Sequence, residues 1–331
     1  MDISLILGNI ISPPILFFFL GMASVLVKSD LEIPNPLPKF FSLYLLIMIG
    51  FKGGHELYAS GFSFKIVQVM GACLVMASVV PIYSFFLLKK RFGAADAAAI
   101  AATFGSISAV TFISAVTFLD AQSVKYSGYM VAGMALMESP AIIIGVLLYN
   151  LYKQDVAATK YKTEKTHWGH LINDALFNGS VMLLVGSLII GIVTGKEGWK
   201  AIAPFEAIFK GMLMFYLLDN GIVAAKRLKS LRGSFGFLIG FSIIMPLFNA
   251  MIGILISRFL LHIDTGDTFL FTILCASASY IAVPAAIRLA IPESNPAFTV
   301  PVALGIVFPF NVIVGIPIYY YIITYLQSIG F

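Results

Sequence analysis

The chain has 331 residues, of which 60% are hydrophobic and 11% are charged, whereas a soluble domain carries about 25% charged residues. So few charged groups could not cover the surface of a soluble domain, and only two cysteines, both in apolar runs, exclude a secreted disulfide scaffold. The net charge of +5 comes without a basic domain, so the composition predicts an integral membrane protein and argues against nucleic-acid binding.

Ten apolar stretches are long enough, or nearly so, to cross a hydrocarbon core of roughly 30 Å. In chain order they cover 12–27, 38–51, 64–88, 95–118, 128–152, 171–194, 205–225, 234–260, 268–290 and 299–326. The first two are short and bounded by prolines. We therefore predict an all-α polytopic membrane protein with about 10 transmembrane helices.

Lys and Arg are divided unequally between the two sets of alternate loops. One set holds 14 of the 21, in the loops around 28–39, 89–91, 153–165, 226–232 and 288. Because cytoplasmic loops carry an excess of Lys and Arg, this set is expected to be cytoplasmic and both termini outside. Lys52, at the predicted outer end of the second span, either neutralises an arriving anion or snorkels toward water, and we favour snorkelling.

One hydrophilic stretch divides the chain into two halves of five spans each. The predicted units are a first five-helix repeat at 1–152, a cytoplasmic linker at 153–170 and a second five-helix repeat at 171–331. Because each half has an odd number of spans, homologous halves would be inverted relative to each other in the membrane.

A shared pattern supports this duplication. Asp96 and Asp267 each stand ten residues before the first serine of a Ser-x-Ser pair, at Ser106 and Ser277. The spans before them both end in Arg-Phe and both contain an interior proline. The common order predicts a duplicated five-span unit with equivalent fourth and ninth spans.

The fourth and ninth spans are rich in small and hydroxyl-bearing residues. Small residues allow close helix packing, which would explain one such helix. Two at matching positions favour helices broken near the membrane midplane, with N-terminal ends that face a bound anion. The hydroxyls expected to complete this site, and to hold a small cation together with freed carbonyls, are those of Ser106, Ser108, Thr111, Ser277 and Ser279.

Two acidic residues lie within predicted spans. Glu138 is flanked by long apolar runs, and ionisable residues at this depth are costly and usually functional. The alternative for Glu138 is a protonated carboxyl that is hydrogen-bonded between helices. Asp219 is either functional, or caps a helix or pairs with Lys226.

Several mechanisms lack their motifs in this sequence. A glycine-rich nucleotide loop followed by Lys-Ser/Thr is missing, which argues against an ATP-driven pump. The four histidines show no metal-ligand spacing, and no Ser/His/Asp set is concentrated in one place. We therefore expect neither an enzyme nor an organic cofactor.

Six motifs occur in one order along the chain. They are Ile49–Gly54, Phe104–Ser108, Met137–Ala141, Asn178–Gly186, Ala276–Pro284 and Arg288–Pro296. In this order they resemble the sodium-dependent bicarbonate transporter family, best known from cyanobacteria, and the resemblance runs nearly end to end.

The resemblance implies two inverted five-helix repeats, a homotrimer in the bacterial inner membrane, and anion and sodium binding where the fourth and ninth spans cross. The substrate-contacting positions of the family correspond to Ser106, Ser108 and Thr111 and to the loop at 277–282. Cyanobacterial members also have a PII-like cytoplasmic regulator, a further partner that the resemblance suggests, although the linker here is short.

Two positions depart from the cyanobacterial pattern. Glu138 stands where those members carry an aspartate before Ile-Pro-Ala, which keeps the carboxyl. Tyr280 stands where they carry an acidic residue. The loss of that carboxylate bears on both sodium coordination and bicarbonate specificity, whereas the hydroxyl groups are retained.

We therefore predict a secondary transporter that imports bicarbonate with sodium by alternating access. The predicted substrate-binding residues are Ser106, Ser108, Thr111, Ser277, Ser279 and Tyr280. The predicted ion-coupling residues are Glu138, Ser108 and Ser279, with sodium as the coupling ion. Two alternatives stay open: a transporter of another small anion coupled to protons or sodium, and a membrane sensor or scaffold whose basic loops bind a partner.

Overall fold

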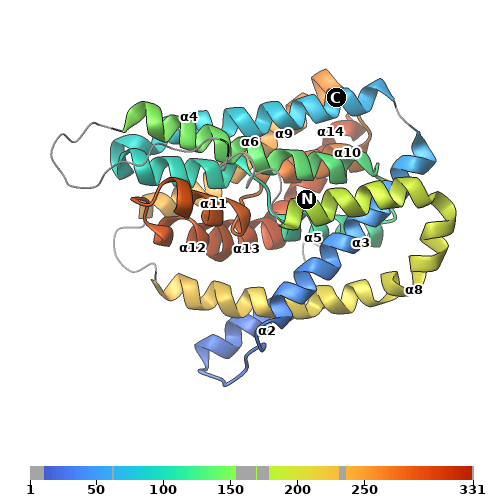
Figure 1. Ribbon diagram of the computed structural model, residues 1–331, viewed down its shortest axis with the longest axis horizontal. Helices are drawn as coiled ribbons and strands as arrows, with labels where there is room; N and C mark the ends of the chain where they lie inside the picture. The colour runs from blue at the N-terminus through green and yellow to red at the C-terminus, as the bar shows by residue number, and fades with distance from the viewer. Residues whose placement is uncertain (1–10, 62, 154–168, 170–178, 231–235, 330–331) are drawn as a thin grey trace.

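The computed structural model describes residues 11–61, 63–153, 169, 179–230 and 236–329 (Figure 1). All regular elements within these ranges are helices. They are α2 (Pro13–Leu26), α3 (Leu37–Ser60), α4 (Phe64–Gly105), α5 (Ala109–Ala121), α6 (Tyr129–Tyr152), α8 (Gly179–Ser230), α9 (Gly236–Ile256), α10 (Thr265–Ala276), α11 (Ala282–Ala290), α12 (Val300–Val302), α13 (Phe308–Phe310) and α14 (Ile316–Ser328). Short 3-10 and π segments continue α9 to Leu261 and connect the pieces from Pro296 to α14.

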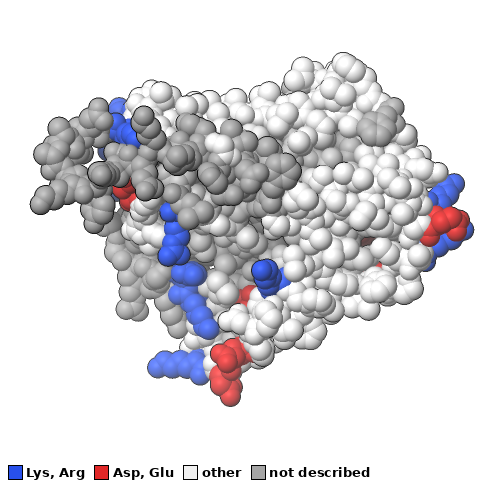
Figure 2. Space-filling view, viewed as in Figure 1, with Lys and Arg blue, Asp and Glu red and all other residues white. Residues whose placement is uncertain are grey.

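Seven helical segments in the described part of the chain are long and apolar enough to cross a membrane. α2 and α10 are shorter apolar helices of 14 and 12 residues. The prediction of an all-α polytopic membrane protein is therefore confirmed. Figure 2 agrees with it, because the charged side chains on the visible face gather mainly toward the two ends of the long axis and leave a broad uncharged band between them.

Two helices are too long to cross a bilayer once, and each changes direction at a glycine. α4 has 42 residues and α8 has 52, whereas about 20 residues span the hydrocarbon core. Gly93 in α4 has φ 74° and Gly195 in α8 has φ 53°, a region that other residues rarely adopt. Figure 1 shows α8 folded back on itself, so that its two arms lie in opposite directions.

The second predicted span is shorter than the helix that the structure shows there. The second span was expected to end at 51, but α3 continues to Ser60, so Lys52 lies within the helix. The sixth span was expected from 171, and its first residues lie outside the described part of the chain.

The helices form two groups, which we call the α3–α8 bundle and the α4–α10 bundle. The first contains α2, α3 and α8, and the second contains α4, α5, α6, α9, α10, α11 and α14. Glycines allow the close packing within the first: a Cβ on Gly21 of α2 would lie 2.2 Å from the Leu218 oxygen of α8, and one on Gly221 would lie 2.1 Å from the Phe18 oxygen. The site described next lies between these two bundles.

Candidate functional site between the two bundles

Two helices are interrupted where the sequence predicts breaks. α4 ends at Gly105 and α5 begins at Ala109, which leaves a first break at Ser106–Ser108. α10 ends at Ala276 and α11 begins at Ala282, which leaves a second break at Ser277–Ile281. Each interruption frees carbonyl groups at one helix end and N–H groups at the next helix start.

The two breaks are hydrogen-bonded to each other. The Ser108 N–H donates to Ser277 Oγ at 3.2 Å, and the Ser279 N–H donates to the Thr103 carbonyl at 2.9 Å. Segments 169 residues apart in the sequence are therefore held side by side. The starts of α5 and α11 consequently lie close together.

Local side chains satisfy some of the freed backbone groups. Ser108 Oγ accepts the Thr111 N–H at 3.2 Å and so caps α5, and the Ser277 hydroxyl donates to the Leu274 carbonyl at 3.1 Å. At the end of α10, Asn311 Nδ2 donates to the Ala276 carbonyl at 2.8 Å. Asn311 therefore has a structural role.

A cavity of about 40 Å³ adjoins both breaks, which is room for roughly three water molecules and thus for a small inorganic ion. Both bundles line it. Its polar lining residues are Ser42, Ser108, Glu138, Ser180, Tyr216, Ser279 and Tyr280. Its size excludes a large organic substrate in this conformation.

Four buried polar atoms around the breaks have no hydrogen-bond partner among the described residues. They are Ser106 Oγ, Thr111 Oγ1, the Tyr280 hydroxyl oxygen and Asn220 Nδ2. An unsatisfied buried group costs about 1–3 kcal/mol. Atoms of this kind also occur elsewhere in the described part of the chain, at Ser84 and Ser257 and, near Lys52, at Glu56 and Tyr126, but those around the breaks lie beside two helix N-termini.

The structure brings together four of the predicted site residues. Ser108, Ser279, Tyr280 and Glu138 all line the cavity. Ser106, Thr111 and Ser277 are buried beside the breaks but do not line it. Ser277 instead joins the breaks.

The sequence interpretation missed the contribution of α8. Tyr216 lines the cavity, and the Tyr280 side chain lies among those of Tyr216, Asn220 and Ser108. Asn220 is buried, whereas the adjacent Asp219, which the sequence singled out, is only half-buried and interacts with Lys226. The only sign of this contribution in the sequence was the polar Asn220 next to Asp219 within an apolar run. One residue does not show which side of α8 packs against the other bundle.

Glu138 lies on α6 and its side chain is 8% exposed. It forms no hydrogen bond or ion pair with any other residue in the part of the chain that the structure describes. The described residues therefore do not form the interhelical hydrogen bond of the alternative interpretation. Its carboxyl is an unpartnered group in the cavity wall.

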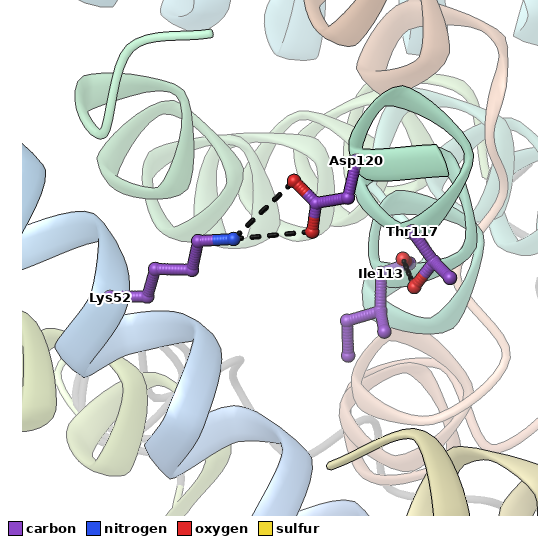
Figure 3. Close-up of polar contacts among 4 residues, drawn as sticks. All are labelled: Lys52, Ile113, Thr117 and Asp120. Carbon is purple, nitrogen blue, oxygen red and sulfur yellow. Dashed lines mark hydrogen bonds and ion pairs between the residues drawn. The ribbon is translucent and has the colours of Figure 1, made fainter. Parts of the chain in front are cut away.

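An ion pair links the two bundles away from the cavity (Figure 3). Lys52 Nζ of α3 lies 3.2 Å from Asp120 Oδ2 at the end of α5, and 5.4 Å from the centre of the Tyr126 ring. The ammonium group of Lys52 is therefore paired with Asp120 in a contact that is exposed to solvent.

Asp96 and Asp267 each accept hydrogen bonds from a segment that leads into a helix of the other half of the chain. Asp96 Oδ1 accepts the Asn295 N–H at 2.7 Å, just before the segment that begins at Pro296. Asp267 accepts the Ser127 N–H at 2.6 Å, the Ser127 hydroxyl at 2.7 Å and the Tyr129 hydroxyl, at the start of α6. Each aspartate therefore anchors the final helix of the opposite half.

Comparison with known proteins gives one finding. A family model described as the Na+-dependent bicarbonate transporter superfamily matches residues 13–324, which is nearly the whole chain. No curated protein matches the chain.

Proposed function

Because the chain belongs to the Na+-dependent bicarbonate transporter superfamily, we propose that it imports bicarbonate together with sodium by alternating access across the bacterial inner membrane. Membership itself makes the chain a multi-pass membrane transporter and not an enzyme. Sodium symport, the direction of transport and the residues involved are the proposal.

The observation that carries the proposal is the meeting of the two breaks at a small cavity. The N-termini of α5 and α11 offer N–H groups and the positive ends of two helix dipoles, which suit an anion. The unsatisfied hydroxyls of Ser106, Thr111 and Tyr280 lie beside them. We assign substrate contact to Tyr280, Ser108 and Ser279, which line the cavity, the support of Ser108 to Ser277, and a place behind the lining to Ser106 and Thr111.

The residues also fit a sodium ion. Discontinuous membrane helices coordinate such cations through carbonyls at their C-terminal ends, and α4 and α10 both end at the breaks. Glu138, Ser108 and Ser279 line the same cavity and would add oxygen ligands. Bound sodium would offset the charge of the anion, which makes binding of each favour the other.

The position of the cavity supports a mechanism in which one bundle moves relative to the other. Both bundles contribute lining residues, so a shift between them would open the cavity to one side of the membrane and close it to the other. Ten spans as two inverted repeats, 1–152 and 171–331 around a linker at 153–170, would agree with the reciprocal contacts of Asp96 and Asp267. A homotrimer and a PII-like regulator at the cytoplasmic linker complete the proposal.

Uptake of labelled bicarbonate into proteoliposomes tests it. We expect uptake that requires an inward sodium gradient. Uptake should fall at least about tenfold in Ser108→Ala, because this variant loses both the cap of α5 and a hydrogen bond to the anion. Thr117→Ala is the matched control, because its hydroxyl bonds only the Ile113 carbonyl of the same helix. Bicarbonate uptake that is unchanged without sodium would contradict the proposal.

The unpartnered Glu138 favours one second candidate, proton-coupled transport of another small anion. Uptake would then follow a pH gradient in sodium-free buffer, and Glu138→Gln would abolish the coupling. A sensor or scaffold function predicts instead that Ser106→Ala and Ser279→Ala leave every activity unchanged.

A further inference from the structure

The polar groups around the cavity are of two kinds. Hydroxyls of Ser108, Tyr216, Ser279 and Tyr280, with the N–H groups at the starts of α5 and α11, can donate hydrogen bonds to an anion. Lys, Arg and His are absent from the described lining residues. An anion in this cavity would therefore be held by neutral donors alone, and Glu138 is the one carboxylic acid among the described lining residues.

Glu138 adds the opposite chemistry. An ionised carboxylate only accepts hydrogen bonds, and this one is buried without a partner among the described residues. Because Glu138 lines the cavity, a molecule bound there can supply the hydrogen bond that the carboxylate lacks. The cavity therefore presents several donors and one strong acceptor to whatever it binds.

This pattern matches an oxyanion that carries one proton. Bicarbonate has two oxygens that accept hydrogen bonds and one hydroxyl that donates. The donors at the breaks would bind the two acceptor oxygens, and the hydroxyl would donate to Glu138. Nitrate has the same planar shape and charge but no hydrogen atom, so one of its oxygens would face the Glu138 carboxylate with no hydrogen bond between them.

We propose that Glu138 is a specificity-determining residue that accepts a hydrogen bond from the substrate hydroxyl, so that the cavity selects protonated planar oxyanions over nitrate. This inference rests on the proposed bicarbonate site. It gives Glu138 a direct contact with the substrate in addition to its part in sodium coupling.

Competition between the two anions tests the inference. Uptake of labelled bicarbonate is measured at fixed sodium and pH 8 with increasing nitrate, and the nitrate inhibition constant is divided by the KM for bicarbonate. For the wild type we expect a ratio of at least about thirty, as for a site built to bond a hydroxyl that the competitor lacks. In Glu138→Gln the carboxamide also offers an N–H to nitrate, so we expect a ratio below about three.

Loss of folded protein lowers the maximal rate of uptake but changes neither constant, so the ratio does not depend on the folded fraction. Binding of the two anions to purified protein gives the same ratio for a variant that binds but no longer transports. Asp219→Asn is the matched control, a carboxyl-to-amide change on a residue outside the cavity lining, and should keep the wild-type ratio.

Two results would overturn the inference and leave the proposed function intact, provided that sodium-dependent bicarbonate uptake is observed. One is a wild-type nitrate inhibition constant equal to the KM for bicarbonate, and the other is a ratio of the two constants that is unchanged in Glu138→Gln. Absence of bicarbonate uptake by the wild type is a different result, which would overturn the proposed function together with the inference.

Discussion

The two interrupted helices have the same layout but are held in different ways. In the first, formed by the end of α4 and α5, Asp96 makes one hydrogen bond, and the three-residue break is capped by Ser108. In the second, formed by α10 and α11, Asp267 accepts three hydrogen bonds. Its five-residue break leads into α11 without a side-chain cap at Ile281.

The second interrupted helix is therefore held by more hydrogen bonds at its start, at Asp267, but has no side-chain cap after its break. The first is held by one hydrogen bond at Asp96, and Ser108 caps the helix after its break. The contact nearest to a cap on α11 joins the Val283 N–H to Ser279 Oγ at 3.5 Å, a long distance for a hydrogen bond. We infer that a bound anion stabilises the second break more than the first.

The largest expected effect compares the two aspartates. Asp267→Ala leaves the buried Tyr129 hydroxyl and the two partly buried donors of Ser127 without their acceptor, so it should lower the free energy of unfolding by about 3–5 kcal/mol. Asp96→Ala removes one contact of a partly exposed residue and should cost about 1 kcal/mol. Chemical unfolding in detergent measures both, and equal losses would contradict the difference between the two helices.

Next in size is the link between the breaks. Ser277→Ala removes the acceptor of the buried Ser108 N–H, a loss of about 1–3 kcal/mol that should weaken bicarbonate binding about tenfold or more. Ser279→Ala loses the long contact to Val283 together with the proposed contact to the anion, so it should weaken binding by at least as much. Titration of both variants with bicarbonate at fixed sodium ranks them, with Thr117→Ala as the control.

The places of both breaks could be predicted because hydroxyl pairs are conspicuous in an apolar background. Ser106 and Ser277 stand at equal distances after an aspartate, and this needs no knowledge of the fold. The end of α3 could not be predicted in the same way. Polar residues there lower the hydropathy, yet the helix continues because they pack within the protein, as His55 does against Trp199 at 5.1 Å between ring centres.

Contacts between distant residues were also beyond the sequence. The partner of Lys52 is 68 residues away, and nothing near Lys52 indicates it. Whether Asp219 or Asn220 lies beside Tyr280 depends on the rotation of α8 about its axis, which the packing of the α3–α8 bundle decides. The residue types of the site were thus predictable, but not the contribution of the opposite bundle.

Substitution of Asn220 should have a smaller effect on bicarbonate binding, and it tests the second break alone because Asn220 lies beside Tyr280. Asn220→Leu removes a buried unsatisfied amide, so the free energy of unfolding should change by less than about 1 kcal/mol. If the amide donates to the anion or orients Tyr280, bicarbonate binding should weaken about three- to tenfold. Binding that equals that of the wild type would show that Asn220 takes no part in anion binding, and Asp219→Asn serves as the control on the same helix.

The smallest expected effect concerns the Lys52–Asp120 pair, which joins the first interrupted helix to the α3–α8 bundle. Asp120 is 43% exposed, so a double-mutant cycle of Lys52→Met and Asp120→Asn should give a coupling below about 1 kcal/mol in unfolding. The pair would then hold α5 to α3 only weakly, and relative movement of the bundles could break it at little cost. A coupling well above that value would mean that the first interrupted helix is firmly fixed to the opposite bundle, which would reverse the comparison made above.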